Sequence, residues 1–399
     1  MWSGRRILVG VCGGIAAYRV CELVSALSQA GADVRVVLTA GAQAFISPLT
    51  LATLSRQVAY TDAEFWHYRQ GRPLHIELAE WAEAILIAPL TANTLAKLAL
   101  GLADNLLTNL CLATAAPLIL APAMNTDMWQ QPTVQQHWGS LLQRHWGLTP
   151  SAGRLACDAV GVGRLVPVPV LEETLAAFLW TRGRRDWQGR TVLVTGGATR
   201  EFWDPVRFLS NPASGRMGAA VANAVAARGA QVIYCYGSGD PPPLHPQVTG
   251  IPFTAAADLE ALLDQYFPQV DTVLMAAAVS DVRPQSYHPH KQPKANLGSQ
   301  IPLSPVPDLV QALAQRKQSG QRIIAWAAQS GDPVPPAREK LHRKQVDAIV
   351  ANAIDQPESG FGSEWNQGTW ITPTQEIPLP HGTKVEMAHR ILDLALTLP

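Results

Sequence analysis

The chain contains 399 residues, of which 47% are hydrophobic and 16% charged, and this length is enough for two or three domains with buried cores. Basic and acidic residues both number 31, so the formal net charge is zero. This balance argues against broad binding to nucleic acid or to an acidic membrane. The five scattered cysteines include no CxxC pair, which argues against a disulfide framework or a zinc site and favours a cytoplasmic setting. Because no run of about 18 uncharged apolar residues is present, no membrane span is expected.

Two segments share one pattern: a strand, a Gly-Gly turn, a helix, the phrase AGA or RGA, and a second strand. They begin at Arg5 and Gly189. Gly31 and Gly229 stand where a helix C-cap belongs. A βαβ unit therefore opens each half, and each half is predicted to form its own parallel sheet.

Further elements are predicted in chain order. In the first half they are strands over residues 84–88 and 118–121 and helices over 18–30, 91–100 and 132–146. In the second half they are strands over 192–195, 231–236, 272–276, 323–327, 348–351 and 369–372 and a last helix over 384–396. Continuous apolar strands are typical of a sheet covered on both faces. The charged stretch 179–190 separates the halves, which predicts domains over 1–188 and 189–399.

Two turns of the first half carry candidate ligand-binding groups. Gly13 and Gly14 follow a strand and let backbone N–H groups approach a phosphate at a helix start. An ordinary structural turn explains this pair equally well, and no GxGxxG follows. Thr91, Asn93 and Thr94 in PLTANT supply hydroxyl and amide groups that either cap a helix or hold a ligand.

Three further residues of the first half suit substrate binding or proton transfer. His75 precedes an expected amphipathic helix, where a histidine is more often a packing or capping residue than a proton acceptor. The motif PAMNTDMW ends a strand in Asn125, and this uncharged amide near Met128 suits a flat apolar ligand and a small anion. Cys157 lies in the Gly-rich stretch 151–165, and a loop of this kind can close over a substrate.

Groups of the second half suit a phosphate site. Asn211 stands ahead of a helix expected to begin near Ser214, and helix starts attract anions. Asp281 ends a strand at the edge where parallel sheets bind ligands, and near a triphosphate its carboxylate can hold Mg²⁺. Candidate cations for phosphate are Lys291 and Lys294 on the Pro-rich stretch 284–305, and Lys340 and Lys344 on a helix. The helical pair equally fits a solvated helix face.

Seven motifs together resemble a known family. GGIAAY, LHIELAEWA, PLTANT, PAMNTDMW and ACDAVGVGRL occur in the order of the flavin-dependent cysteine decarboxylases, and DPVRFLSNPASGRMG and KLHRKQVDAIVAN resemble phosphopantothenate–cysteine ligase. Nearly the whole chain is similar to the family in which phosphopantothenoylcysteine decarboxylase is fused to that ligase for coenzyme A biosynthesis. The resemblance implies an α/β fold with two doubly wound parallel-sheet domains, flavodoxin-like at the N-terminus and Rossmann-like at the C-terminus.

For the first domain, the resemblance implies an FMN-dependent decarboxylase. Flavin-binding turns are implied at Gly13, Gly14, Thr39, Thr91, Asn93 and Thr94, with Met128 beside the substrate. The same resemblance makes His75 the catalytic base, Asn125 the group that binds the substrate carboxylate, and Cys157 the proton donor. FMN is then expected to oxidise the substrate thiol to a thioaldehyde. Loss of carbon dioxide yields an enethiolate, which is protonated and reduced again.

For the second domain, the resemblance implies a CTP-dependent ligase. CTP activates the phosphopantothenate carboxylate as an acyl-cytidylate with loss of pyrophosphate, and cysteine then displaces CMP. Asn211 is expected to position the acyl-cytidylate, and Lys291 matches the catalytic loop lysine. CTP contacts are implied for Met275, Ala276, Ala277, Asp281, Pro307, Asp308, Leu309, Val310, Trp326, Lys340 and Lys344. Asp281 is also the expected Mg²⁺ ligand.

The second half departs from the family pattern in four motifs. GFAAET reads AWAAQS with Trp326, Gln329 and Ser330, AND reads ANA with Ala353, DYR reads DVR with Val282, and KIKK reads KQPK with Pro293. Loss of carboxylates near a nucleotide and a metal weakens Mg²⁺ or cytosine binding. A decarboxylase with a degenerate ligase half therefore remains an alternative.

Two other functional classes also remain open. A nucleotide-dependent oxidoreductase is suggested by the βαβ openings, although GxGxxG and an acidic ribose-binding residue are missing. A regulatory flavoprotein often loses part of the catalytic set, whereas this chain keeps it. The expected partners are the small molecules phosphopantothenate, cysteine and CTP, with no nucleic acid and no membrane. By resemblance, the protein is a homo-oligomer with trimeric first domains, active sites between subunits, dimeric ligase domains and, together, a dodecamer.

Overall fold

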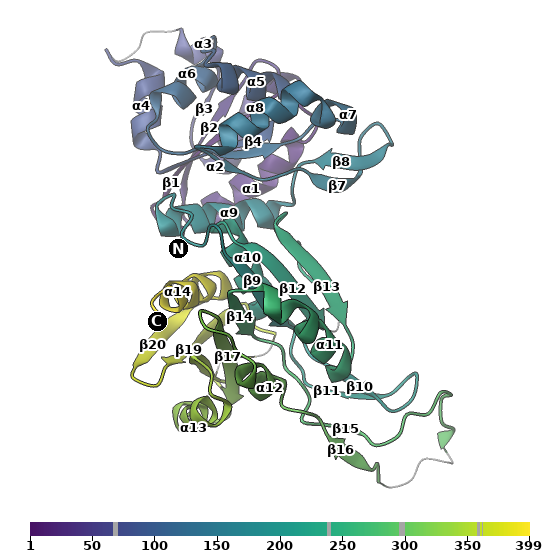
Figure 1. Ribbon diagram of the computed structural model, residues 1–399. Helices are drawn as coiled ribbons and strands as arrows, with labels where there is room; N and C mark the ends of the chain where they lie inside the picture. Colours follow the sequence, from purple (N-terminus) through teal and green to yellow (C-terminus); the bar gives the residue numbers. More distant parts are fainter. Residues whose placement is uncertain (67–70, 238–240, 295–299, 357–359, 361) are drawn as a thin grey trace. The chain divides into compact units, whose positions relative to one another are not determined.

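The computed structural model describes residues 1–66, 71–237, 241–294, 300–356, 360 and 362–399. The chain forms two compact units, Met1–Arg184 and Arg185–Pro399 (Figure 1). The division between them falls inside the charged stretch 179–190. Within the described residues, no helix is both long enough and apolar enough to cross a membrane.

The first unit is built on a six-stranded parallel sheet in the order β3-β2-β1-β4-β5-β6. Its strands are β1 (Arg6–Val11), β2 (Asp33–Leu38), β3 (Ala59–Tyr60), β4 (Ala84–Leu90), β5 (Ile119–Pro122) and β6 (Trp146–Gly147), with a separate hairpin of β7 (Ser151–Arg154) and β8 (Val160–Arg164). Its helices are α1 (Ala17–Gln29), η1 (Ala42–Ala44), α2 (Pro48–Ser55), α3 (Asp62–Phe65), α4 (Leu74–Trp81), α5 (Ala92–Leu100), α6 (Leu106–Ala113), α7 (Thr126–Gln130), α8 (Pro132–Leu142) and α9 (Val168–Thr181). The prediction of a doubly wound parallel sheet is confirmed for this unit.

Helices cover both faces of this sheet (Figure 1). Leu78 of α4, Leu95 of α5 and Leu110 of α6 join Ile85 and Ile87 of β4 in one buried cluster. On the other face α1 contacts α2 and α9, and both α1 and α9 contact β4. Because the strands are buried on both faces, the groups available for chemistry lie in the turns at their carboxyl ends.

Two predicted elements of this unit are wrong in detail. The helix expected over residues 132–146 ends earlier because Trp146 joins the sheet, where its backbone N–H donates to Leu118 O at 2.8 Å. The Gly-rich stretch 151–165, expected as a mobile loop, is instead the antiparallel hairpin β7–β8. The helix expected over 91–100 is confirmed, with Thr91 as its N-cap.

The second unit is built on an eight-stranded sheet in the order β13-β12-β9-β14-β17-β18-β19-β20. Its strands are β9 (Thr191–Gly196), β12 (Gln231–Gly237), β13 (Val248–Phe253), β14 (Thr272–Met275), β17 (Arg322–Gln329), β18 (Ala348–Ala353), β19 (Trp365–Ile371) and β20 (Glu376–Thr383). Its helices are α10 (Arg216–Ala227), α11 (Ala256–Tyr266), η2 (Phe267–Gln269), α12 (Leu309–Gln315), α13 (Val334–Lys344) and α14 (Lys384–Leu396). Apolar clusters join α10 and α14 to one face, and α11, α12 and α13 to the other.

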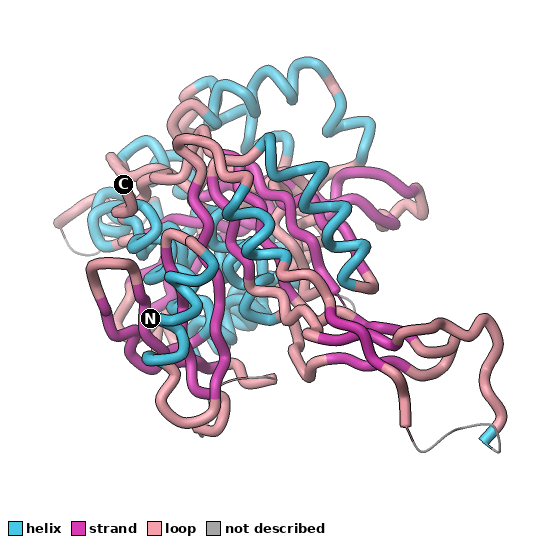
Figure 2. The backbone as a smooth tube through the Cα atoms, turned by 60° about the horizontal axis from the view of Figure 1, so that its bottom comes forward, coloured by secondary structure: helices cyan, strands magenta, loops and turns pink. Residues whose placement is uncertain are grey.

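The second sheet is parallel except at one edge. β19 runs antiparallel to β18 and to β20, so the strand expected over residues 369–372 is the end of a longer hairpin strand. Two short antiparallel ribbons project from this unit, β10 (Arg200–Phe202) with β11 (Phe208–Ser210) and β15 (Val282–Pro284) with β16 (Leu303–Pro305). Figure 2 shows the two ribbons side by side, and β10 contacts β15. The Pro-rich stretch 284–305 therefore begins and ends in paired strands.

Small residues let α10 approach the centre of the second sheet. A Cβ on Gly218 would meet Gly196 Cα at 2.7 Å and Thr195 O at 2.8 Å, so only glycine fits this contact. The helix begins at Arg216, two residues later than expected, after Gly215 with φ of +75°. Its first turn consequently lies against the end of β9, where a ligand of a parallel sheet is held.

Candidate active sites

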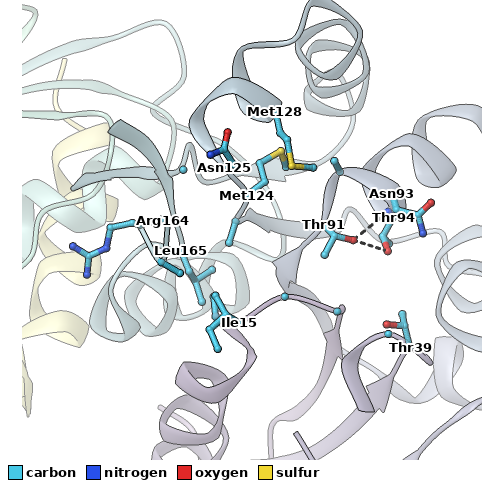
Figure 3. Close-up of a pocket in the computed structure, with 18 of the residues that line it drawn as sticks. Ile15, Thr39, Thr91, Asn93, Thr94, Met124, Asn125, Met128, Arg164 and Leu165 are labelled. Atoms are coloured by element: carbon cyan, nitrogen blue, oxygen red, sulfur yellow. Dashed lines mark hydrogen bonds between the residues drawn. The ribbon is translucent and has the colours of Figure 1, made fainter. Parts of the chain in front are cut away.

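A cavity of about 1080 Å³ opens at the carboxyl ends of the strands of the first unit. Its walls come from turns far apart in the sequence, and Figure 3 shows Thr39, Thr91 and Asn125 around it. These turns follow β2, β4 and β5 respectively. Of the residues predicted for this site, the cavity is lined by Gly13, Gly14, Thr39, Thr91, Asn93, Thr94, Asn125, Met128 and Cys157.

The turn after β1 lies in close backbone contact with the turn after β2. A Cβ on Gly13 would meet the carbonyl carbon of Gly41 at 2.6 Å, so a larger residue there would displace one of the two turns. Gly14 has space around it, since a Cβ there would meet only Thr91 Cγ2 at 3.9 Å. Opposite, the Thr91 hydroxyl caps α5 by accepting from the N–H of Thr94 at 3.4 Å. The result is a cradle of backbone and hydroxyl groups beside a helix N-terminus.

The hairpin β7–β8 brings Cys157 to Asn125. The Asn125 Nδ2 lies 3.6 Å from Cys157 Sγ, and Asn125 Oδ1 accepts from the N–H of Asp127 at 2.7 Å. The second bond caps α7 and fixes the direction of the amide, so the Asn125 NH₂ group faces the thiol. An amide donor and a thiol thus meet at the wall of the cavity, from elements 32 residues apart.

Glycines seat this hairpin against the segment before α7. A Cβ on Gly163 would meet Met124 O at 2.1 Å, and one on Gly161 would meet Thr126 Oγ1 at 2.3 Å. The Met124 N–H donates to Gly163 O at 2.9 Å. Backbone contact therefore positions the hairpin tip, and the Gly-rich composition serves close packing.

Burial separates Cys157 from the other cysteines near the cavity. Cys12 and Cys111 are buried, and burial raises the pKa of both thiols. Cys157 is exposed and lines the cavity. A buried thiol is inert because its thiolate is poorly solvated, so Cys157 is the cysteine able to exchange a proton with a bound molecule.

His75 is not brought to this cavity within one chain. It lies in the first turn of α4, not ahead of the helix as expected, and it is not among the residues that line the cavity. Its ring meets Phe65 edge-on at 5.5 Å between centroids, and its buried Nδ1 has no hydrogen-bond partner among the described residues. The structure therefore brings together two of the three predicted catalytic residues of the first half.

A second cavity of about 500 Å³ lies in the second unit. The predicted residues that line it are Asn211, Met275, Ala276, Ala277, Asp281, Pro307, Asp308, Leu309, Val310, Trp326, Lys340 and Lys344. They come from the residue after β11, from the end of β14 and the segment that leads to β15, from β17, from the start of α12 and from α13. Of the residues predicted for this site, Lys291 and Lys294 fall outside this lining.

The α13 wall of this cavity is cationic. Lys340, Arg343 and Lys344 all line it, and Lys344 Nζ lies 3.1 Å from Asp308 Oδ1. Burial, together with the neighbouring charges of Lys344 and Arg343, lowers the pKa of Lys340. Crowded ammonium groups repel one another, so an anionic ligand here would relieve that repulsion.

Two other walls carry an amide and an indole. Asn211 Nδ2 donates to Val279 O at 3.2 Å, and this bond fixes the side chain at the wall of the cavity. Trp326 presents its ring to the cavity, while its buried Nε1 has no hydrogen-bond partner in the described part of the chain. A flat ring and an amide suit a heteroaromatic base and an acyl group.

Lys291 lies on the Pro-rich stretch beside a well-anchored neighbour. The backbone of Gln292 donates to Asp204 Oδ2 at 3.3 Å, and its carbonyl accepts from Arg207 at 3.2 and 3.3 Å. Asp204 is fully buried and pairs with Arg207 at 2.7 Å, and hydrogen bonds from backbone N–H groups keep the pKa of its carboxyl low. No cluster of three or more potential metal ligands of the His, Cys, Asp or Glu type occurs among the described residues.

Sequence reasoning missed several residues that line the cavities. In the first unit they include Ile15, Arg19, Lys97, Asp104 and Arg154; in the second they include Arg216, Arg343, Asn352, Asn366 and Lys384. Arg343 had a signal, because it stands at i+3 from Lys340 on the same helix. Lys384 had none, because its place in the wall depends on how α14 packs against α10.

Comparisons with known proteins agree with this architecture. The family model Flavoprotein matches residues 1–179, and the model DNA/pantothenate metabolism flavoprotein C-terminal domain matches residues 187–398. The chain is 36% identical over 397 residues to the coenzyme A biosynthesis bifunctional protein CoaBC of Bacillus subtilis (strain 168), a match over 98% of this chain and 97% of that protein.

Solved structures match each half separately. A mutant PPC decarboxylase complexed with pantothenoylaminoethenethiol is 36% identical, with a TM-score of 0.41 over 44% of this chain and 98% of that chain. The C-terminal domain of a CoaBC protein is 33% identical, with a TM-score of 0.44 over 52% of this chain and 94% of that chain. On the strength of the family models and the full-length relative, the chain belongs to the CoaBC family of coenzyme A biosynthesis bifunctional proteins.

Proposed function

We propose that this chain catalyses two steps of coenzyme A biosynthesis. The second unit ligates cysteine to phosphopantothenate with CTP, and the first unit decarboxylates the resulting phosphopantothenoylcysteine with FMN. The observation that carries this proposal is the 3.6 Å approach of Asn125 Nδ2 to Cys157 Sγ at the wall of the larger cavity. The match of residues 1–179 to a flavoprotein family supports a flavin in that cavity.

The larger cavity fits FMN by its size and its chemistry. Gly13 and Gly14 keep one wall free of side chains, and Thr39, Thr91 and Asn93 offer hydroxyl and amide groups. When bound, FMN accepts electrons from the substrate thiol and returns them after carbon dioxide has left. The cavity volume of about 1080 Å³ leaves room for substrate beside it.

Asn125 and Cys157 divide the remaining work of decarboxylation. Asn125 holds the substrate carboxylate by hydrogen bonds and without a charge pair. A strong ion pair would stabilise the ground state, whose charge is about to leave, and would slow the reaction. Cys157 delivers the proton to the carbon that loses carbon dioxide. Met128, on the next turn, excludes water from that carbon.

A neighbouring subunit completes the first site. Since the His75 of one chain does not line the cavity that Asn125 and Cys157 share, we place His75 of an adjacent copy there as the base. This arrangement is consistent with trimers of the first unit that have active sites between subunits. Large apolar side chains exposed on this unit, including Leu49 and Trp66, at 75% and 72%, support burial against another copy. Dimers of the second unit would extend the assembly to a dodecamer.

The smaller cavity takes CTP and the phosphopantothenate carboxylate. We place the cytosine against Trp326 and the backbone of residues 275–277, with further contacts from residues 307–310. The phosphates lie near Lys340 and Lys344, with Mg²⁺ at Asp281. Asn211 positions the acyl-cytidylate, and Lys291 reaches it from the Pro-rich stretch.

Apart from Trp326, which lines this cavity, the departures from the family pattern lie off it. Val282, Pro293, Gln329, Ser330 and Ala353 are not among its lining residues. Their replacement therefore leaves the lining of the cavity unchanged, and Trp326, the one departure in the lining, keeps an aromatic ring there. This supports a working ligase over a degenerate one.

Supplying each half-reaction separately tests the proposal. With phosphopantothenoylcysteine alone, the purified yellow protein should form phosphopantetheine. With phosphopantothenate, cysteine, CTP and Mg²⁺, mass analysis should detect CMP and pyrophosphate. Decarboxylation without any ligation would indicate the degenerate ligase, and a flavin-bound protein with neither reaction would indicate a regulatory flavoprotein.

A further inference from the structure

One wall of the smaller cavity carries two cationic side chains to which the proposed function assigns no role. Lys384 is the first residue of α14, and Arg216 is the first residue of α10. Both line the cavity. This wall is separate in the sequence from the α13 cations, and it is built where α10 and α14 pack together.

Lys384 is buried, and no carboxylate among the described residues pairs with it. It is only 7% exposed, and its Nζ donates to Gly360 O at 3.4 Å. Within the described residues the structure shows no ion pair for this ammonium group, which carries three N–H donors. The nearby carboxylate of Glu364 pairs with Arg216 at 2.6 Å instead. Lysine is almost never buried unless paired, so this ammonium group is suited to bind an anion in the cavity that it lines.

The position of Lys384 in its helix is also unfavourable for a cation. The first turn of a helix carries partial positive charge and prefers acidic residues. Thr383 and Glu386 already cap α14 through a capping box, so the helix start does not need the lysine. Burial and the charge of Arg216 lower the pKa of Lys384. The local arrangement therefore costs stability unless an anion binds.

We propose that Lys384 and Arg216 form a phosphate-binding subsite of the smaller cavity. This inference rests on the proposed ligase function. Gly215 and Met217, at the start of α10, line the cavity beside them, so backbone N–H groups of a twelve-residue helix add to the attraction. The phosphate belongs either to the triphosphate of CTP or to phosphopantothenate.

The test compares Lys384→Met with wild type in the full-length, flavin-loaded protein. We expect the KM for CTP or for phosphopantothenate to rise roughly 10- to 100-fold, the loss typical of one charge-assisted hydrogen bond. The ligand whose KM rises identifies the source of the phosphate. Equilibrium dialysis with CTP and Mg²⁺, and with phosphopantothenate, reports binding directly if turnover is too slow to measure.

A second readout separates binding from a structural role. Removal of a buried unpaired charge should leave the melting temperature of the ligand-free variant unchanged or raised, whereas loss of a structural lysine would lower it. Lys317→Met is the matched control, because Lys317 pairs with Asp347 at 2.6 Å and does not line the cavity. This control should keep both KM values.

Each outcome decides between the two proposals. Unchanged KM and binding for both ligands in Lys384→Met would overturn the subsite while leaving the ligase function intact. A lower melting temperature with unchanged binding would make Lys384 structural. If wild type neither binds nor uses either ligand, the proposed ligase function fails and the subsite fails with it.

Discussion

Cys157 is the residue whose replacement gives the clearest chemical signature. In Cys157→Ser, the serine hydroxyl is a weaker acid than the thiol and does not protonate the carbon of the decarboxylated intermediate. The oxidised enethiol should therefore accumulate in place of phosphopantetheine. Mass analysis distinguishes the two products by two hydrogens. Cys21→Ser is the control, because Cys21 is partly exposed but does not line the cavity. Reduced product formed by Cys157→Ser at the wild-type rate would show that the proton comes from elsewhere.

We predict that nucleotide binding is coupled to protonation of Lys340. Its pKa is lowered by burial and by the charges of Lys344 and Arg343, so Lys340 loses its proton at a lower pH than a solvated lysine does. A bound triphosphate favours the charged form and raises this pKa, so CTP binding should take up a proton there and weaken as pH rises. Calorimetry in buffers of different ionisation enthalpy measures this uptake. Equal uptake by Lys340→Met would assign the proton to another group.

The hairpin β7–β8 is the element that positions Cys157, the proposed proton donor. A Cβ at Gly163 would meet Met124 O at 2.1 Å, so Gly163→Ala must push β8 away and separate Cys157 from Asn125. We expect the decarboxylation rate to fall by about tenfold or more, while bound flavin and ligase activity are retained. The control is Gly139→Ala in α8, where a Cβ meets nothing within 4 Å. Full activity in Gly163→Ala would show that hairpin placement does not limit the rate.

At the scale of the whole molecule, the start of the second unit belongs to its core. Arg228 is fully buried and bonds to Asp186 at 2.6 and 2.8 Å and to Asp393 at 2.7 Å, and Trp187 is fully buried beside it. A fragment of residues 185–399 should therefore fold, whereas one of residues 191–399 leaves Arg228 without Asp186. The melting temperature of the 191–399 fragment should be lower than that of the 185–399 fragment by roughly 5 °C or more. Equal melting temperatures in a thermal scan would contradict this account of the boundary.

The sequence predicted the residues of the sites better than the elements that position them. The PAMNTDMW and ACDAVGVGRL motifs identified Asn125 and Cys157, and the structure places them together. The sequence did not predict the hairpin, because β7 and β8 contain glycines, which have low strand propensity. The pairing of these two strands also depends on contact with Met124. The sequence did not show that His75 lies off the cavity of its own chain, and the proposed function assigns it to the cavity of a neighbouring copy. The burial of Lys384 depends on the packing of α14 against α10, which local patterns do not encode.

The most direct test follows the carboxyl carbon of cysteine through both units. Purified protein is incubated with Mg²⁺ and cysteine labelled at that carbon, either with both phosphopantothenate and CTP or with one of the two omitted, and labelled carbon dioxide is measured. The account predicts release of label only when both phosphopantothenate and CTP are present. Release from cysteine without CTP, or no release under any of these conditions, would contradict it.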